Sequence, residues 1–105
     1  MAKPKLILTV SPTFKANVAI PVAGKAPVNV EFTFKHRTRD QFREFLEALE
    51  GREDAAVLMD IASGWDLDDA FDADSVEQMI QSYMGSAHAV LNAYMAELTG
   101  ARVKN

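Results

Sequence analysis

Residues 14–35 of this 105-residue chain read FKANVAIPVAGKAPVNVEFTFK. Apolar and polar side chains alternate on both sides of a short segment rich in glycine and proline, and a period of two is typical of a strand with one buried face. The apolar positions are Phe14, Ala16, Val18, Ile20 and Val22 before that segment, and Val28, Val30, Phe32 and Phe34 after it. Two such runs joined by a turn over residues 23–27 predict a β-hairpin, whose apolar face must be covered by another element.

The flanks of the hairpin predict a small antiparallel sheet within residues 5–35. Residues 5–10 (KLILTV) form a short apolar run that predicts a first strand, which ends where Ser11-Pro12 interrupts it. Pro21 lacks the N–H group that a sheet ladder uses, so we expect its strand to lie at an edge of the sheet or the ladder to stop there.

Residues 38–99 have the periodicity of helices rather than strands. Thr38 and Gln41 have the spacing of a capping box, which marks a helix start, and Gly51 marks a helix stop. The inward positions of the first helix are Phe42, Phe45, Leu46 and Leu49. A short second helix covers about residues 54–62, and a third, capped by Asp72 or Asp74, carries Val76, Met79, Ile80 and Tyr83. A fourth helix carries Ala87, Val90, Leu91, Tyr94 and Leu98 and ends at Gly100. Strands followed by helices predict an α+β fold, with about four helices packed on the sheet and the hairpin buried against the first of them.

Length and composition predict a single domain over residues 1–105, with residues 100–105 as a polar tail. The chain has no cysteine, which excludes disulfides and thiolate metal sites. No apolar run approaches the roughly 20 residues of a membrane-spanning helix, and the N-terminal run is too short for a signal peptide. We therefore expect no membrane association and a place in the cytoplasm.

The distribution of charge argues against general binding of nucleic acid. The net charge is −4, although the first 52 residues hold nine of the eleven Lys and Arg residues. An acidic protein repels the phosphate backbone, so we expect no nucleic-acid partner.

No pattern in the chain predicts catalysis or a cofactor site. The two histidines, His36 and His88, have no neighbouring serine motif for acyl transfer, and no phosphate-binding glycine loop is present. Residues 66–77 (DLDDAFDADSVE) have the length and acidity of a calcium loop, but Ala70 and Phe71 stand where a ligand and a glycine are required. We expect no enzyme activity, no metal and no cofactor.

Adaptable side chains in the third and fourth helices make binding of another protein the better hypothesis. The candidate partner-binding residues are Met79, Tyr83, Met84, Tyr94 and Met95. Met and Tyr fit irregular partner surfaces, although at helical spacing each of them is also typical of a core. Trp65 is either a core anchor or a binding hot spot, and we expect it in the core.

Three segments of the C-terminal half resemble the phage tail assembly chaperone family. These segments are GWDLDDAF (residues 64–71), YMGSA (83–87) and LNAYMAELTGARVKN (91–105). Where the family has Tyr-Pro-Gly-Ala, this chain has Tyr83-Met84-Gly85-Ser86, so the proline is absent and the glycine is kept.

The resemblance implies a protein of a phage or prophage that keeps the long tape measure protein soluble and helps to recruit tail tube subunits. It also implies a role in the host cytoplasm during virion morphogenesis and absence from the mature virion. Self-association into a homo-oligomer is compatible with this role. The alternative is a structural tail component, such as a tube or completion protein.

Overall fold

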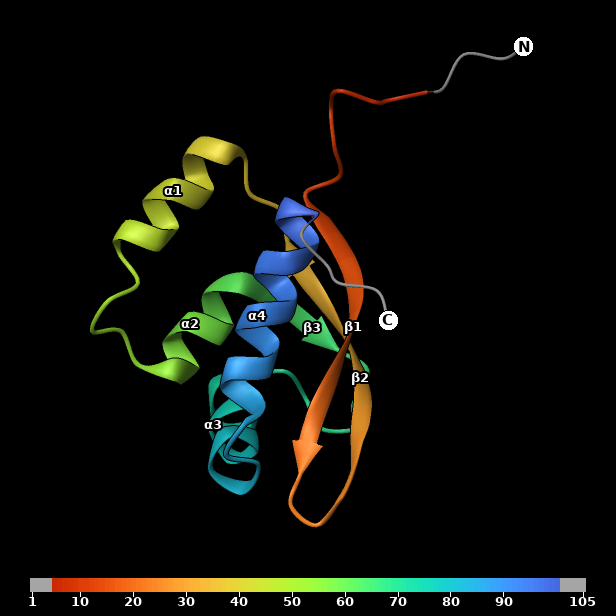
Figure 1. Cartoon of the computed structure of the whole chain (residues 1–105), viewed down its shortest axis with the longest axis vertical. Coiled ribbons are helices and arrows are strands. Elements are labelled where there is room, and N and C mark those ends of the chain that lie inside the picture. The colour runs from red at the N-terminus through yellow and green to blue at the C-terminus, as the bar shows by residue number, and fades with distance from the viewer. Residues whose placement is uncertain (1–4, 101–105) are drawn as a thin grey trace.

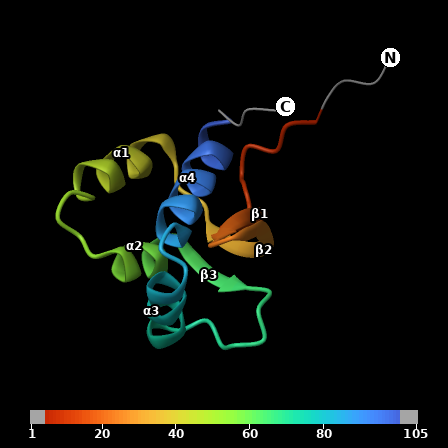
Figure 2. The same cartoon turned by 60° about the horizontal axis from the view of Figure 1, so that its bottom comes forward.

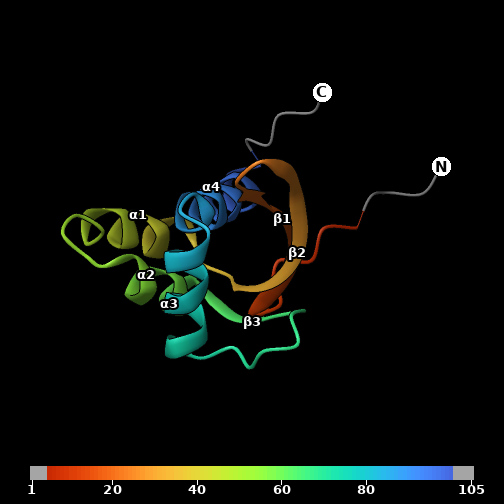
Figure 3. The same cartoon turned by 90° about the horizontal axis from the view of Figure 1, so that it is seen from below.

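The computed structural model describes residues 5–100 as an α+β fold, as the sequence predicts (Figure 1). Its three strands form an antiparallel sheet in the order β1-β2-β3. Seen from below, the strands curve along one side of the molecule and the helices gather on the other (Figure 3). Residues 1–4, and most of the predicted polar tail, residues 101–105, lie outside the described residues.

The predicted hairpin is present, and its second strand extends into the segment predicted to be the turn. Strand β1 (Thr13–Val22) pairs with β2 (Lys25–Lys35) from Thr13↔Lys35 to Val22↔Lys25. The turn is therefore only Ala23-Gly24, shorter than the predicted residues 23–27, because Gly24 adopts a φ of 74°, a conformation that favours glycine. β1 is an edge strand, and its register shifts between Ile20 and Val22, around Pro21.

The third strand of the sheet is not the predicted one. Residues 5–10 form no strand, and the third strand is β3 (Ala62–Trp65), which pairs with β2 through Phe32↔Trp65 and Phe34↔Ala62. The predicted second helix thus ends at Ile61, one residue early. Ala62 has extended backbone angles, and four residues are too few to show a period of two.

The four helices begin and end close to their sequence signals. They are α1 (Arg39–Glu47), α2 (Asp54–Ile61), α3 (Ala73–Ser82) and α4 (Ser86–Thr99). Thr38 and Gln41 form the complete capping box of α1, and the side chain of Asp72, rather than that of Asp74, caps α3. α4 ends at Gly100, which has a φ of 71°.

The helix that covers the hairpin is α4, not α1 as predicted. α4 packs along β1, and α2 contacts β2 and β3 (Figure 1). The ring of Tyr94 lies 5.3 Å from that of Phe34 and 6.1 Å from that of Phe45. Phe45 therefore contacts the core at Tyr94, while Leu46 on the same helix stays exposed.

The buried apolar residues form one cluster between the sheet and helices α2, α3 and α4. Its members are Ala16, Val18, Ile20, Val30, Phe32, Phe34, Phe45, Val57, Leu58, Ile61, Ala62, Val76, Met79, Ala87, Val90 and Tyr94. The predicted inward positions of the hairpin are buried except Val28, near its tip, and the half-buried Phe14 and Val22. None of the helices within residues 5–100 is long and apolar enough to cross a bilayer.

The turn between α3 and α4 favours a glycine for a steric reason. Gly85 has an ordinary φ of −86°, so backbone freedom is not what this position needs. A Cβ atom there would lie 3.1 Å from Cγ of Pro21, closer than most real contacts of a Cβ. Gly85 thus lets the start of α4 approach the far end of β1.

Candidate partner-binding surface

The structure separates the five predicted partner-binding residues into exposed and buried groups. Met84 is 92% exposed and Tyr83 is 41% exposed, and both lie in the turn between α3 and α4. Met95 is half-buried, Met79 is 8% exposed and Tyr94 is fully buried. The buried side chains present little or no surface to a partner in this conformation.

Two cavities lie between α4 on one side and α1 with the turn after it on the other, and we call the pair the α1–α4 groove. One cavity of about 580 Å³ lies near the start of α1, where Phe42 faces Leu98. A second cavity of about 340 Å³ lies beyond the end of α1, where Leu49 faces Leu91 and Met84. Figures 1 and 2 show α1 beside α4 in both views.

The second cavity is mainly apolar, although Arg52, Asp54 and His88 also line it. In the first cavity Phe42 and Leu98 lie among polar residues, namely His36, Arg37, Thr38, Arg39 and Thr99. The apolar positions that α4 contributes are Ala87, Leu91 and Leu98, and the half-buried Met95 has the same helical spacing. Val57 and Leu58 of α2 form the floor of the second cavity. The exposed Met84 therefore stands at one end of an apolar stripe along α4.

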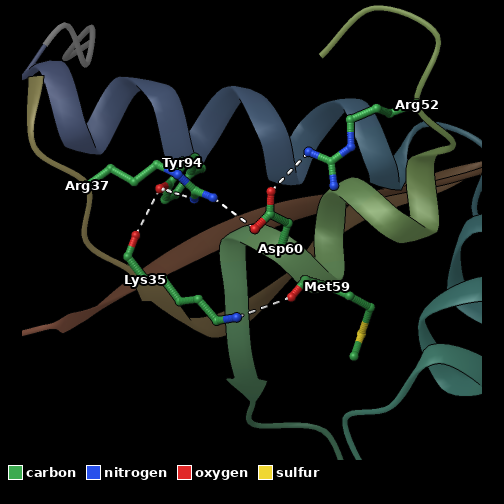
Figure 4. A network of polar contacts seen from close by, with 6 residues as sticks. All are labelled: Lys35, Arg37, Arg52, Met59, Asp60 and Tyr94. Carbon is green, nitrogen blue, oxygen red and sulfur yellow. Dashed lines mark hydrogen bonds and ion pairs between the residues drawn. The ribbon is translucent and has the colours of Figure 1, made fainter. Parts of the chain in front are cut away.

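Arg37 holds α1 against the body of the protein. Its Nη1 donates to the hydroxyl of Tyr94 at 2.8 Å, and its Nη2 donates to Oδ1 of Asp60 at 2.8 Å (Figure 4). Its guanidinium carbon lies 4.6 Å from the centre of the Phe45 ring, a cation–π distance. The second oxygen of Asp60 accepts from Nη1 of Arg52 at 2.9 Å.

Burial and the neighbouring arginines determine the protonation states of Asp60 and Tyr94. Burial alone would raise the pKa of Asp60, but Arg52 and Arg37 outweigh it and hold that pKa below its usual value. Burial raises the pKa of Tyr94, although Arg37 opposes the shift. The cluster therefore contains a charged Asp60 and a neutral Tyr94 at neutral pH.

A third cavity, of about 460 Å³, opens beside α1 and is polar. It is lined by Lys35, His36, Arg37, Gln41, Glu44, Phe45, Ala48, Arg52 and Asp60. We call it the polar cavity. Arg52 lines both the polar cavity and the second cavity of the α1–α4 groove.

Sequence reasoning missed the cluster around Arg37, Arg52 and Asp60. One local signal points to it: Asp60 follows five apolar residues within the short, largely apolar α2 (DAAVLMDI), and a charge in such a place usually has a partner. The identity of its partners depends on the tertiary fold, because Arg37 lies 23 residues earlier in the chain.

A further exposed apolar surface is the segment before β1. Leu6, Ile7, Leu8 and Val10 are all exposed, with Leu8 at 89%. Figure 1 shows this segment leading away from the helices. Four large aliphatic side chains exposed within five residues are unusual on an isolated domain and are typical of an interaction site.

Trp65 and the acidic stretch after it have structural contacts. The half-buried indole of Trp65 packs edge-on against Phe32 and Phe71, and its Nε1 donates to the carbonyl of Asp69 at 2.7 Å. Oδ1 of Asp66 accepts from the N–H of Glu31 at 2.9 Å. Within residues 5–100 no group of three or more His, Asp or Glu side chains is placed to hold a metal ion.

Comparison with known proteins agrees with these observations. The family model described as phage tail assembly chaperone matches residues 1–105, the whole chain. No curated protein and no solved structure matches the chain. The chain therefore belongs to the phage tail assembly chaperone family.

Proposed function

We propose that this chaperone binds an apolar helical segment of the tape measure protein in the α1–α4 groove. The observation that supports it best is the apolar stripe of α4 that ends at Met84, whose side chain is 92% exposed. An amphipathic helix commonly binds by placing its apolar face in such a groove. A methionine at the groove entrance adapts to partners of irregular shape. Membership of a chaperone family is in keeping with a binding role rather than a catalytic one.

We further propose that the apolar segment of residues 5–10 contacts the tail tube subunit. A role in recruiting tube subunits requires a surface that stays free while the groove is occupied. This segment is exposed and rich in residues that favour strands, and it leads into the edge strand β1. An extended apolar segment can join the free edge of another sheet through main-chain hydrogen bonds.

The proposed role takes place in the cytoplasm of the host during tail assembly. A chaperone that leaves its client on assembly is absent from finished particles, whereas a tube or completion protein remains. Mass spectrometry of purified virions from the phage or prophage that carries this gene distinguishes the two. Detection of this chain in stoichiometric amount in virions would contradict the chaperone role.

The experiment that tests groove binding is co-expression of the tape measure protein with this chain, scored by the soluble fraction of the tape measure protein. We expect solubility to depend on this chain and to fall with Met84→Asp. Val28→Asp is the matched control, because Val28 is exposed near the hairpin tip, on an element that does not line the groove. Equal solubility of the tape measure protein with and without this chain would contradict the proposed function.

A titration across salt then tests the type of contact. Apolar burial is insensitive to screening, so affinity for a tape measure fragment should change little between about 50 and 500 mM salt. The heat capacity change on binding should be negative. Loss of binding at high salt, with no effect of Met84→Asp, would remove the groove from the proposal.

A further inference from the structure

The polar cavity has an excess of positive charge, although the chain as a whole has a net charge of −4. Lys35, Arg37 and Arg52 line it, together with the carboxylates of Glu44 and Asp60 and with His36. Asp60 is shared, because one of its oxygens lies 2.8 Å from Arg37 and the other 2.9 Å from Arg52 (Figure 4). One carboxylate between two guanidinium groups leaves a positive charge without its own partner.

Arg52 has unused hydrogen-bond donors in this cavity. A guanidinium carries five N–H donors, and within residues 5–100 Arg52 uses only Nη1, toward Asp60. Its side chain is 31% exposed, so a partner can reach part of it. The planar fork of an arginine matches the two oxygens of a carboxylate.

Lys35 adds a second available cation. Its Nζ lies 3.5 Å from the carbonyl oxygen of Met59, which is the outer limit of a hydrogen bond. A carboxylate is a stronger acceptor for an ammonium group than a distant carbonyl. The cavity thus offers cationic donors from two elements, β2 and the turn between α1 and α2.

We propose that the polar cavity binds a carboxylate of the partner, namely an acidic side chain adjacent to the apolar face of the bound helix, and that Arg52 determines this specificity. The inference rests on the proposed function, because it names the chemistry of the segment held in the α1–α4 groove. Arg52 links the two sites, since it lines both the polar cavity and the groove. Apolar contact supplies most of the affinity, and the carboxylate fixes which stretch of a long apolar stripe is bound, and in which register.

The test uses two model peptides that differ in a single side chain. Both are amphipathic helices with the same leucine stripe, and one carries Glu and the other Gln beside that stripe. We expect the wild-type protein to bind the Glu peptide about threefold more tightly at about 50 mM salt, as is typical of a partly exposed ion pair. The preference should shrink at about 500 mM salt.

Variants of this chain locate the effect. Arg52→Gln should abolish the preference for the Glu peptide while binding of the Gln peptide continues. Arg43→Gln is the matched control, because Arg43 pairs with Asp40 on the exposed surface of α1 and does not line the cavity. Arg52→Lys keeps the charge and removes the fork, so it should retain a reduced preference even if Arg52→Gln folds poorly.

Glu44→Gln gives a result that a merely structural role of Arg52 would not produce. Glu44 is an exposed carboxylate that lines the cavity, so its removal should increase the preference for the Glu peptide. Equal wild-type affinity for the two peptides would overturn the carboxylate site and leave the groove proposal intact. Binding of neither peptide would contradict the groove proposal itself. An equal loss of preference in Arg43→Gln and Arg52→Gln would show general attraction between charges and overturn the cavity as its cause.

Discussion

The hydroxyl of Tyr94 lies 2.8 Å from Nη1 of Arg37, which donates a hydrogen bond to it. The same hydroxyl donates to the carbonyl of Lys35 at 2.8 Å, so α4 is attached to the end of β2 at this point. Since Arg37 also contacts the ring of Phe45, one buried tyrosine connects the sheet, α4 and α1. The Tyr94–Arg37 contact therefore helps to hold α4 on the sheet and also positions α1, which forms one wall of the α1–α4 groove.

Tyr94→Phe should lower the free energy of unfolding by roughly 1–3 kcal/mol, because it leaves the carbonyl of Lys35 and one N–H of Arg37 without their partner. The measurement is equilibrium urea denaturation. Tyr83→Phe is the control, since Tyr83 is 41% exposed and its change should stay within about 0.5 kcal/mol. If Tyr94→Phe changed the free energy of unfolding as little as Tyr83→Phe does, the two hydrogen bonds of the Tyr94 hydroxyl would contribute no net stability.

Asp60→Asn should lower the free energy of unfolding at neutral pH. That free energy should then fall less steeply in acid than it does in the wild type. Burial opposes the charge of Asp60, but Arg52 and Arg37 hold its folded pKa below the unfolded value of about 3.9. The stabilisation is therefore present above about pH 4 and is lost as pH falls through the lowered pKa. The side chain is 35% exposed, so we expect a loss of about 1 kcal/mol at pH 7.

Thermal unfolding followed from pH 7 to pH 2 checks this expectation. Asp68→Asn, in the exposed loop after β3, is the matched control and should follow the wild-type curve. If the unfolding temperature of Asp60→Asn falls in acid as steeply as that of the wild type, other carboxylates cause the acid sensitivity.

Phe45→Ala should detach α1 while the sheet stays folded. Phe45 is 5% exposed and packs on Arg37 and Tyr94, whereas the main helix contacts with the sheet come from α4 and α2. We expect a loss of about 3 kcal/mol and rapid amide hydrogen exchange over residues 40–48, with protection kept in β1 and β2. Leu46→Ala, at an exposed position of α1, should change exchange little. Uniform loss of protection across the chain would contradict a separately opening α1.

The sequence predicted the elements whose signals are local. Alternation located the hairpin, and side-chain spacing located the capping box at Thr38 and the stop at Gly100. The partner of each element was harder to predict, because a period of two shows which face is buried but not what covers it. The hairpin was thus expected under α1 and lies under α4.

The errors in the sheet have the same physical origin. Residues 5–10 have an apolar composition that favours a strand, but composition does not show whether a segment pairs, and these residues pair with neither edge strand of the sheet, β1 or β3. β3 has four residues, ASGW, which carry no periodic signal and pair with β2 because the chain after α2 passes beside it.

The candidate site could be predicted only in part. Met84 was a candidate because of its adaptable side chain, and the structure shows that it is exposed in the turn between α3 and α4. Met79 and Tyr94 have the same residue chemistry, and only the packing of α3 and α4 shows that they are buried. The pairing of Arg37 and Arg52 with Asp60 joins two connecting segments to α2, and the local sequence shows only that Asp60 needs a partner, not which residues provide it.

The last prediction concerns the exposed segment before β1. Leu6→Ser combined with Leu8→Ser should leave the free energy of unfolding within about 0.5 kcal/mol of wild type, because both side chains are more than four-fifths exposed. The same pair should weaken co-purification of the tail tube subunit, since the exposed leucines are the proposed contact. Val18→Ser is the contrasting variant: Val18 is buried at 2% exposure, so stability should fall by roughly 2 kcal/mol or more. Urea denaturation and pull-down of the tube subunit are measured on all three proteins. If the double variant retains the tube subunit as well as wild type does, residues 5–10 are not its binding site. If the double variant instead loses stability as Val18→Ser does, the segment packs on the body of the protein and is not free for a partner.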